Sequence, residues 1–132
     1  MVVLLALLLF SLSCTKNEAK LSDFVVGTWK SDNLDMGGTT VYFTAEIKTS
    51  TYVLSLTTPD GSYTYACPET GYTIIEKGDK IVIDQPQFPN NPPSTGTVTF
   101  IVSNWIPGGN KMTWTPDAGS DSGTPTINWT RK

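Results

Sequence analysis

The chain has 132 residues, enough for one domain of ordinary size and too few for two. Its net charge is -3 with acidic and basic residues interspersed, so no basic stripe exists to neutralise a phosphate backbone, and we expect no nucleic-acid partner. The absence of histidine excludes Ser-His and Cys-His catalysis and the common zinc sites, and we therefore expect a protein that is not an enzyme and holds no cofactor or metal.

The N-terminal segment is typical of a targeting signal. Eleven of the first 13 residues are apolar, a run that suits the core of a signal peptide and is too short to cross about 30 Å of hydrocarbon as a helix. The run ends in Ser11-Leu12-Ser13-Cys14, which resembles the lipobox of bacterial lipoproteins. This resemblance implies that Cys14 is lipidated and becomes the mature N-terminus, so that the protein is anchored in the cell envelope, in the periplasm or at the outer-membrane surface.

The resulting domain organisation has three parts. We expect a signal peptide over residues 1–13, a polar flexible tether over 14–23, and a folded domain over 24–132. If Cys14 carries lipid, then Cys67 has no disulfide partner in the chain. Because Cys67 follows an alternating strand pattern and has no histidine to activate it, we expect a buried, unreactive thiol.

The folded domain is predicted to be all-β. From Cys14 onward, 48 of 119 residues are Val, Ile, Thr or aromatic, whereas only 10 are Ala, Leu or Met, which excludes a helical bundle. Turn residues such as Pro59-Asp60-Gly61 and Lys77-Gly78-Asp79 divide the chain into segments with period-two hydrophobicity. The pattern predicts nine strands, over residues 25–33, 39–48, 51–58, 62–66, 72–76, 80–84, 97–105, 111–115 and 126–131.

Short connections make successive strands antiparallel neighbours, with a single long loop near residues 86–96. Eight or nine such strands form either a sandwich or an up-and-down barrel, and the shortness of the links favours the barrel. Alternation places a set of apolar side chains on the inner face: Val41, Phe43, Ile81, Ile83, Val98, Phe100, Val102, Met112 and Trp114. In the segment 51–58 the inner face is either that of Tyr52, Leu54 and Leu56 or that of Val53.

Two short motifs carry a family resemblance. Gly27-Thr28-Trp29 in the first strand resembles the Gly-x-Trp signature of the lipocalins, and Trp129-Thr130-Arg131 resembles the end of the small lipocalin-like domains of bacterial lipoproteins. The resemblance implies that Trp29 plugs the closed end of a barrel and that Arg131 from the last strand packs across its face. It also implies a monomer that binds a small hydrophobic or amphipathic ligand.

The interior has two interpretations, because an eight-stranded barrel is just wide enough to be filled by its own side chains or to hold one small ligand. Candidate lining residues of a cavity or core are Phe43, Tyr52, Leu54, Tyr65, Phe100 and Trp114. A hollow barrel indicates a ligand-binding module. A filled barrel indicates a surface module that contacts a protein or a glycan.

Other candidate sites are weaker. Asp117 and Asp121 lie in a loop whose spacing does not match a calcium-binding loop, and Asp32 and Asp35, considered as an acid–base pair, flank a turn before Gly37-Gly38. We therefore expect solvated loops at both places. The proline-rich segment 86–93 is a spacer or a cover for the mouth of the barrel.

Overall fold

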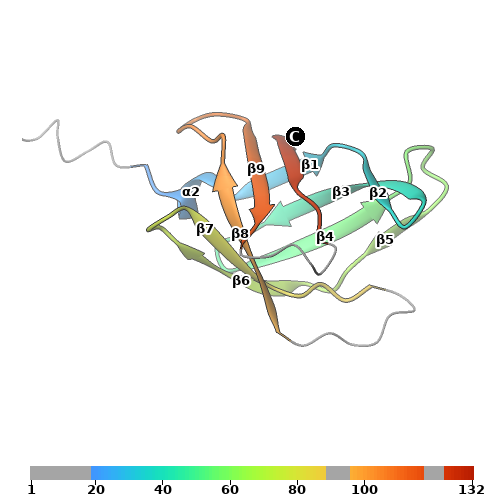
Figure 1. Cartoon of the computed structure of the whole chain (residues 1–132), viewed down its shortest axis with the longest axis horizontal. Helices are drawn as coiled ribbons and strands as arrows, with labels where there is room; N and C mark the ends of the chain where they lie inside the picture. The colour runs from blue at the N-terminus through green and yellow to red at the C-terminus, as the bar shows by residue number, and fades with distance from the viewer. Residues whose placement is uncertain (1–18, 89–95, 118–123) are drawn as a thin grey trace, which may run out of the picture.

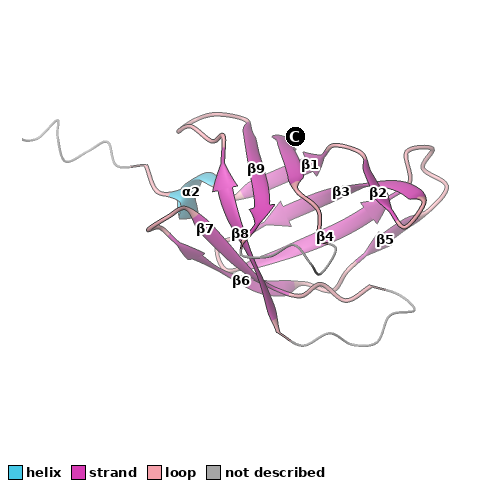
Figure 2. Cartoon of the chain, in the orientation of Figure 1, coloured by secondary structure: helices cyan, strands magenta, loops and turns pink. Residues whose placement is uncertain are grey.

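The computed structural model describes residues 19–88, 96–117 and 124–132. Within these ranges the chain forms one short helix and ten strands (Figures 1 and 2). The elements are α2 (Leu21–Phe24), β1 (Gly27–Ser31), β2 (Leu34–Met36), β3 (Thr39–Ile47), β4 (Thr51–Thr57), β5 (Thr64–Ala66), β6 (Thr70–Ile75), β7 (Lys80–Asp84), β8 (Thr97–Ser103), β9 (Lys111–Pro116) and β10 (Ile127–Arg131).

Eight of the strands close into an antiparallel up-and-down barrel. Its order is β1, β10, β9, β8, β7, β6, β4 and β3, and β3 pairs again with β1. Each strand runs antiparallel to both neighbours, and β1 and β10, at opposite ends of the domain, are hydrogen-bonded directly. The predicted barrel is therefore confirmed, and the sandwich alternative is excluded because the sheet has no separate second layer.

The strands β2 and β5 lie outside the ring of eight. β2 was not predicted, because three residues are too few to show alternation; it forms a hairpin with the start of β3, with Met36 opposite Thr39. The turn between them is Gly37-Gly38, and both glycines have positive φ. β1 is shorter than the predicted strand over 25–33, because Val25 is the C-cap of α2.

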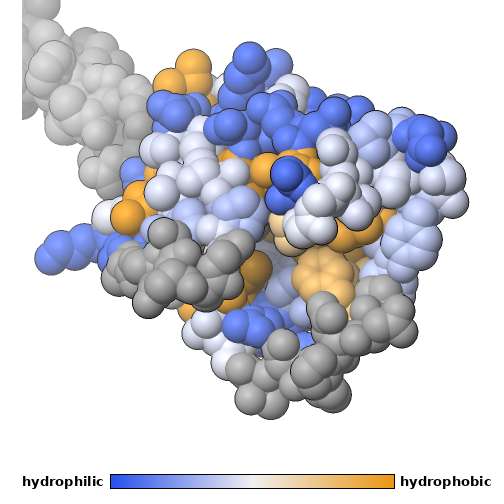
Figure 3. All heavy atoms as spheres, turned by 45° about the vertical axis from the view of Figure 1, so that its right-hand side comes forward, coloured by the Kyte–Doolittle hydropathy of each residue, from blue (hydrophilic) through white to orange (hydrophobic). Residues whose placement is uncertain are grey.

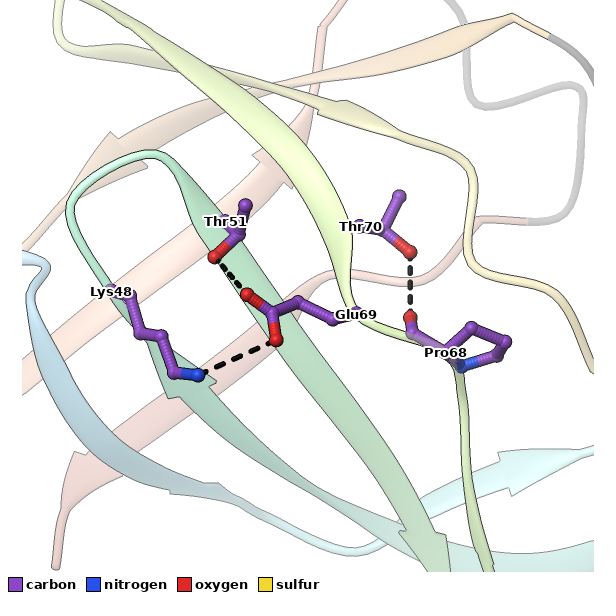
Figure 4. Close-up of polar contacts among 5 residues, drawn as sticks. All are labelled: Lys48, Thr51, Pro68, Glu69 and Thr70. Carbon is purple, nitrogen blue, oxygen red and sulfur yellow. Dashed lines mark hydrogen bonds and ion pairs between the residues drawn. The ribbon is translucent and has the colours of Figure 1, made fainter.

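β5 and β6 share β4 as a partner. Ala66 of β5 lies opposite Ser55, and Gly71 of β6 lies opposite Thr51. The residues between β5 and β6 separate the two strands, and Figure 4 shows the polar contacts at this break. The Glu69 carboxylate accepts hydrogen bonds from Thr51 Oγ1 at 2.6 Å and from Lys48 Nζ at 3.4 Å, and these contacts lower its pKa. The Thr70 hydroxyl donates to the carbonyl of Pro68 at 2.7 Å. The break is thus tied to the start of β4.

The core follows the predicted alternation. Eight of the nine predicted core residues are buried, namely Val41, Phe43, Ile81, Ile83, Phe100, Val102, Met112 and Trp114. Each such apolar side chain contributes about 1.5 to 3 kcal/mol when fully buried. In β4, Tyr52 and Leu54 point inward and Val53 does not, which decides between the two faces left open. The prediction for Val98 is wrong, because this residue is only half-buried and lines a cavity in the barrel.

The ordered domain begins earlier than predicted. Leu21, which was placed in a tether over residues 14–23, is fully buried as the first residue of α2. Its backbone N–H donates to Glu76 Oε1 at 2.8 Å, so the start of α2 is fixed to the residue that follows β6. The boundary at residue 24 is therefore three residues too late. Cys14 and the signal segment 1–13 lie outside the described residues.

Candidate functional site

The two ends of the barrel differ, and α2 covers one of them (Figure 1). At this closed end, Trp29 of β1 and Arg131 of β10 are opposite each other in the strand register. The Arg131 guanidinium carbon lies 4.2 Å from the centre of the Trp29 ring and 5.2 Å from that of Phe24. The predicted contact between Trp29 and Arg131 is present, and Phe24 adds a second aromatic face.

Hydrogen bonds fix these side chains to the last residue of α2 and to the segment between α2 and β1. Arg131 donates from Nη2 to the carbonyl of Phe24 at 2.8 Å and from Nη1 to that of Val26 at 2.9 Å. Trp29 donates from Nε1 to the carbonyl of Val25 at 2.8 Å. Carbonyl groups at the end of a helix have no partner within the helix, so side chains from the first and last strands satisfy them here.

Gly27 explains the first position of the Gly-x-Trp motif. Its φ is +142°, and a Cβ at this position would lie 2.5 Å from Arg131 Nη1. A side chain here would displace the guanidinium from its two carbonyl acceptors. The glycine is therefore required by the close approach of Arg131 as well as by the backbone conformation.

Two further residues complete the closed end, and the sequence pattern did not identify either of them. Trp105 packs against Phe24 with ring centres 5.1 Å apart. Glu76 accepts hydrogen bonds from the backbone N–H groups of Leu21 and Ser22, at 2.8 and 3.3 Å. Desolvation opposes ionisation of Glu76, but hydrogen bonds from the Ser22 side chain and from the two backbone N–H groups, together with the nearby charge of Lys20, outweigh it and lower its pKa. Both residues act across the fold on α2, and local periodicity carries no signal for such contacts.

The other half of the barrel is hollow. A cavity of about 470 Å³ extends from the interior to the end opposite α2, which we call the mouth. Figure 3 is turned to bring this side forward and shows apolar atoms in a hollow bordered by polar ones. The volume falls in the range of small-molecule sites, about 300 to 1,000 Å³. The barrel interior is therefore not filled by its own side chains.

Aromatic and aliphatic side chains form most of the wall. The aromatic residues are Phe43, Tyr52, Phe88, Phe100, Trp114 and Trp129, and the aliphatic ones include Ala45, Leu54, Ile83, Val98 and Ile127. Polar lining residues are Gln85, Thr97 and Thr124. They lie at strand ends or in connections at the mouth. Within the described part of the chain, no charged side chain lines the cavity.

Five of the six predicted lining residues are brought together here, namely Phe43, Tyr52, Leu54, Phe100 and Trp114. Tyr65 is the exception: it packs against the edge of the core but does not line the cavity. The reason is that β5 lies outside the ring of eight strands. Trp129 and Phe88 also line the cavity, although neither was among the predicted lining residues. Phe88 belongs to the proline-rich segment that was expected to be a spacer or a cover for the mouth.

The polar atoms in the cavity wall differ in their partners. The Tyr52 hydroxyl donates to the backbone carbonyl of Asp84 at 2.5 Å. Burial raises the pKa of Tyr52 strongly, and the neighbouring Cys67 and Asp84 raise it further. The Trp114 indole Nε1 lies 3.3 Å from Met112 Sδ. The buried Trp129 Nε1 has no hydrogen-bond partner in the described structure.

Cys67 is buried beneath β4, where its backbone N–H donates to the carbonyl of Leu54 at 2.7 Å. Burial raises the pKa of the Cys67 thiol to about 11. A thiol with a high pKa holds little thiolate at neutral pH. The prediction of a buried cysteine is confirmed.

The weaker candidates have structural roles. Asp35 Oδ1 accepts the backbone N–H of Gly38 at 2.9 Å, within the β2–β3 turn. Asp117 pairs with Lys80 at 2.9 Å, and Asp121 lies outside the described residues. Asp32 borders a depression of about 420 Å³ on the outer surface over β1 and β10, whose wall is mostly polar and charged. No group of three or more potential metal-ligating Cys, Asp or Glu residues occurs in the described ranges.

Comparison with protein-family models, with curated proteins and with solved structures finds no match to this chain. Among the described residues, no helix is both long and apolar enough to cross a bilayer.

Proposed function

We propose that the protein binds one small hydrophobic or amphipathic molecule inside the barrel. The observation that carries this proposal is the cavity of about 470 Å³ with a mostly apolar wall and a polar mouth. Removing apolar surface from water is favourable by roughly 25 cal/mol per Å². Binding of an apolar ligand is therefore favoured by burial of the ligand surface and by burial of the cavity wall. The proposal involves no catalysis.

The residues at the mouth support selection of a ligand by its shape and by its polarity. Phe43 and Phe88 have ring centres 6.5 Å apart, so an aromatic side chain of the proline-rich connection packs against the cavity wall. Gln85 directly follows β7 and Thr97 begins β8, so both lie close by at the two ends of the connection. A ligand with an apolar body and a polar end would place that end among these groups.

Titration with a neutral fluorescent probe tests the proposal. N-phenyl-1-naphthylamine should bind the wild type with one-to-one stoichiometry and a large rise in emission. Val98→Trp places a large side chain at a half-buried position of the cavity wall. The matched control is Thr99→Trp, because Thr99 is the next residue of β8 and does not line the cavity.

The proposal predicts that Val98→Trp weakens probe binding at least tenfold and that Thr99→Trp leaves it within twofold of the wild type. The absence of binding to the wild type would contradict it. Equal binding by both variants would place the probe outside the barrel and would contradict it as well.

We also propose that the protein is held at a membrane of the cell envelope through lipid on Cys14. The support is the apolar run of residues 1–13 that ends at this cysteine. Cells grown with a clickable fatty acid should label the wild type and leave Cys14→Ala unlabelled. Equal labelling of the two proteins would reject lipidation of Cys14 and would leave the ligand-binding proposal intact.

A further inference from the structure

Trp129 combines complete burial with an unpaired polar atom. Its side chain is 1% exposed, it lines the cavity, and its indole Nε1 has no hydrogen-bond partner in the described structure. Native proteins pair the great majority of their buried donors, because a buried donor without an acceptor costs about 1 to 3 kcal/mol. An acceptor for this N–H is therefore expected from outside the chain.

The neighbouring protein groups are already engaged. Trp129 lies opposite Ser31 of β1 and Met112 of β9 in the strand register. The Ser31 hydroxyl donates to the carbonyl of Asp32 and accepts from the backbone N–H of Phe43, both at 2.8 Å. The Met112 sulfur lies against the indole N–H of Trp114. Since Trp129 lines the cavity, a molecule bound there can supply the acceptor.

The charge of the wall restricts that acceptor. The described lining residues include no Lys or Arg that could pair with an anion and no Asp or Glu that could pair with a cation. Transfer of an unpaired charge into an apolar site is so costly that charged groups are neutralised or excluded. The part of a ligand that lies inside the barrel is therefore uncharged.

We infer that the ligand is an uncharged, mainly apolar molecule with a carbonyl or ether oxygen that accepts the Trp129 indole N–H. This inference rests on the proposed function, because it specifies the chemistry of the same cavity. A carboxylate such as that of a fatty acid does not fit the inner wall. A ketone, an ester, an amide or an ether does.

Three naphthalene probes separate the effects of a hydrogen-bond acceptor, of shape and of charge, because they differ in a single substituent. The probe 2-acetylnaphthalene carries a carbonyl oxygen, 2-ethylnaphthalene has the same shape without an acceptor, and 2-naphthoate carries a charge. In the purified protein labelled with ¹⁵N-tryptophan, each of the four tryptophans gives one indole N–H signal, and Trp129→Phe assigns that of Trp129.

We expect 2-acetylnaphthalene to move the Trp129 indole proton signal downfield, and 2-ethylnaphthalene to bind without that downfield shift. Trp129→Phe should lower the preference for the acetyl over the ethyl probe about fivefold, as expected for one hydrogen bond. Trp105→Phe is the matched control: Trp105 packs against Phe24 at the closed end and does not line the cavity, so the preference should not change. We expect 2-naphthoate to bind at least tenfold more weakly than 2-acetylnaphthalene.

Identical shifts of the Trp129 signal with the acetyl and ethyl probes would overturn the inference and leave the proposed function standing. The signal would then be explained by the ring of Trp114, whose centre lies 5.1 Å from that of Trp129. If none of the probes binds, the proposed function itself fails. Sequential assignment of uniformly ¹³C,¹⁵N-labelled wild type identifies the same signal, so the comparison of shifts holds even if Trp129→Phe does not fold.

Discussion

Gly27 leaves room for the guanidinium group of Arg131, which lies where a side chain at residue 27 would begin. The two residues are 104 positions apart, at opposite ends of the domain, and they meet because β1 and β10 are paired. The contact places the cation on the face of Trp29 and within reach of two backbone carbonyls. Closure of the barrel and coverage of its end therefore depend on one small group of residues.

Gly27→Ala should lower the free energy of unfolding by about 2 kcal/mol or more, because the methyl group strains a positive φ and displaces Arg131. Urea unfolding measures this loss. Gly61→Ala is the control, since Gly61 also has positive φ but has no neighbouring atom within 4 Å of an added Cβ. We expect the smaller loss there, about 1 kcal/mol. Equal losses would show that the contact with Arg131 has no part in the requirement for glycine.

Arg131→Ala should destabilise the fold by about 2 kcal/mol, through loss of two charge-assisted hydrogen bonds and the contact with Trp29. Lys132→Ala removes an adjacent exposed charge and should change stability little. Trp29→Ala should cost more, about 3 to 5 kcal/mol, because it leaves a cavity under α2. Urea unfolding curves of the three variants rank these effects, and an Arg131→Ala protein as stable as Lys132→Ala would disprove the role of the guanidinium.

Stability should decrease in alkaline solution because of Tyr52. Its pKa is raised above the unfolded value of 10.0, mainly by burial, so the folded state holds the phenolic proton more tightly. The resulting stabilisation is complete below pH 10 and is lost as the pH rises toward the folded pKa. Burial also raises the pKa of Tyr72, which acts in the same direction.

Tyr52→Phe should therefore make the decrease above pH 10 less steep, and at pH 7 it should cost about 1 kcal/mol for the lost bond to the carbonyl of Asp84. Urea midpoints at pH 8 and pH 11 measure both effects. The variant Tyr63→Phe controls for removal of an exposed phenol. If Tyr52→Phe leaves the decrease of stability between pH 8 and pH 11 unchanged, then groups other than Tyr52 cause that decrease.

Cys67 should resist thiol reagents while the protein is folded. The side chain is 3% exposed, and burial raises its pKa to about 11, so both access and thiolate are limited at neutral pH. Labelling with a maleimide at pH 7, followed by peptide mapping to identify the modified residue, should show slow reaction of Cys67 in buffer and rapid reaction in 8 M urea. Rapid labelling of Cys67 in buffer would mean that the region between β5 and β6 opens readily.

Alternation and short connections in the sequence were sufficient to predict the barrel, whereas the contact between Trp29 and Arg131 was expected from the resemblance of two short motifs to those of the lipocalins. The sequence was not sufficient for the cavity. Alternation shows that Phe43 and Trp114 point inward, but the empty volume depends on how all inward side chains fit together. Val98 is half-buried for the same reason, because its exposure depends on how the other inward side chains pack around it. Glu76 and Trp105 were missed because their partners in α2 are distant in the sequence.

The central claim is that the barrel holds one apolar molecule in its cavity, and native mass spectrometry tests it most directly. Protein prepared without detergent is mixed with N-phenyl-1-naphthylamine and compared with Val98→Trp and Thr99→Trp under the same conditions. The account predicts a one-to-one adduct on the wild type and on Thr99→Trp and none on Val98→Trp. An adduct of equal abundance on Val98→Trp, or none on the wild type, would contradict it.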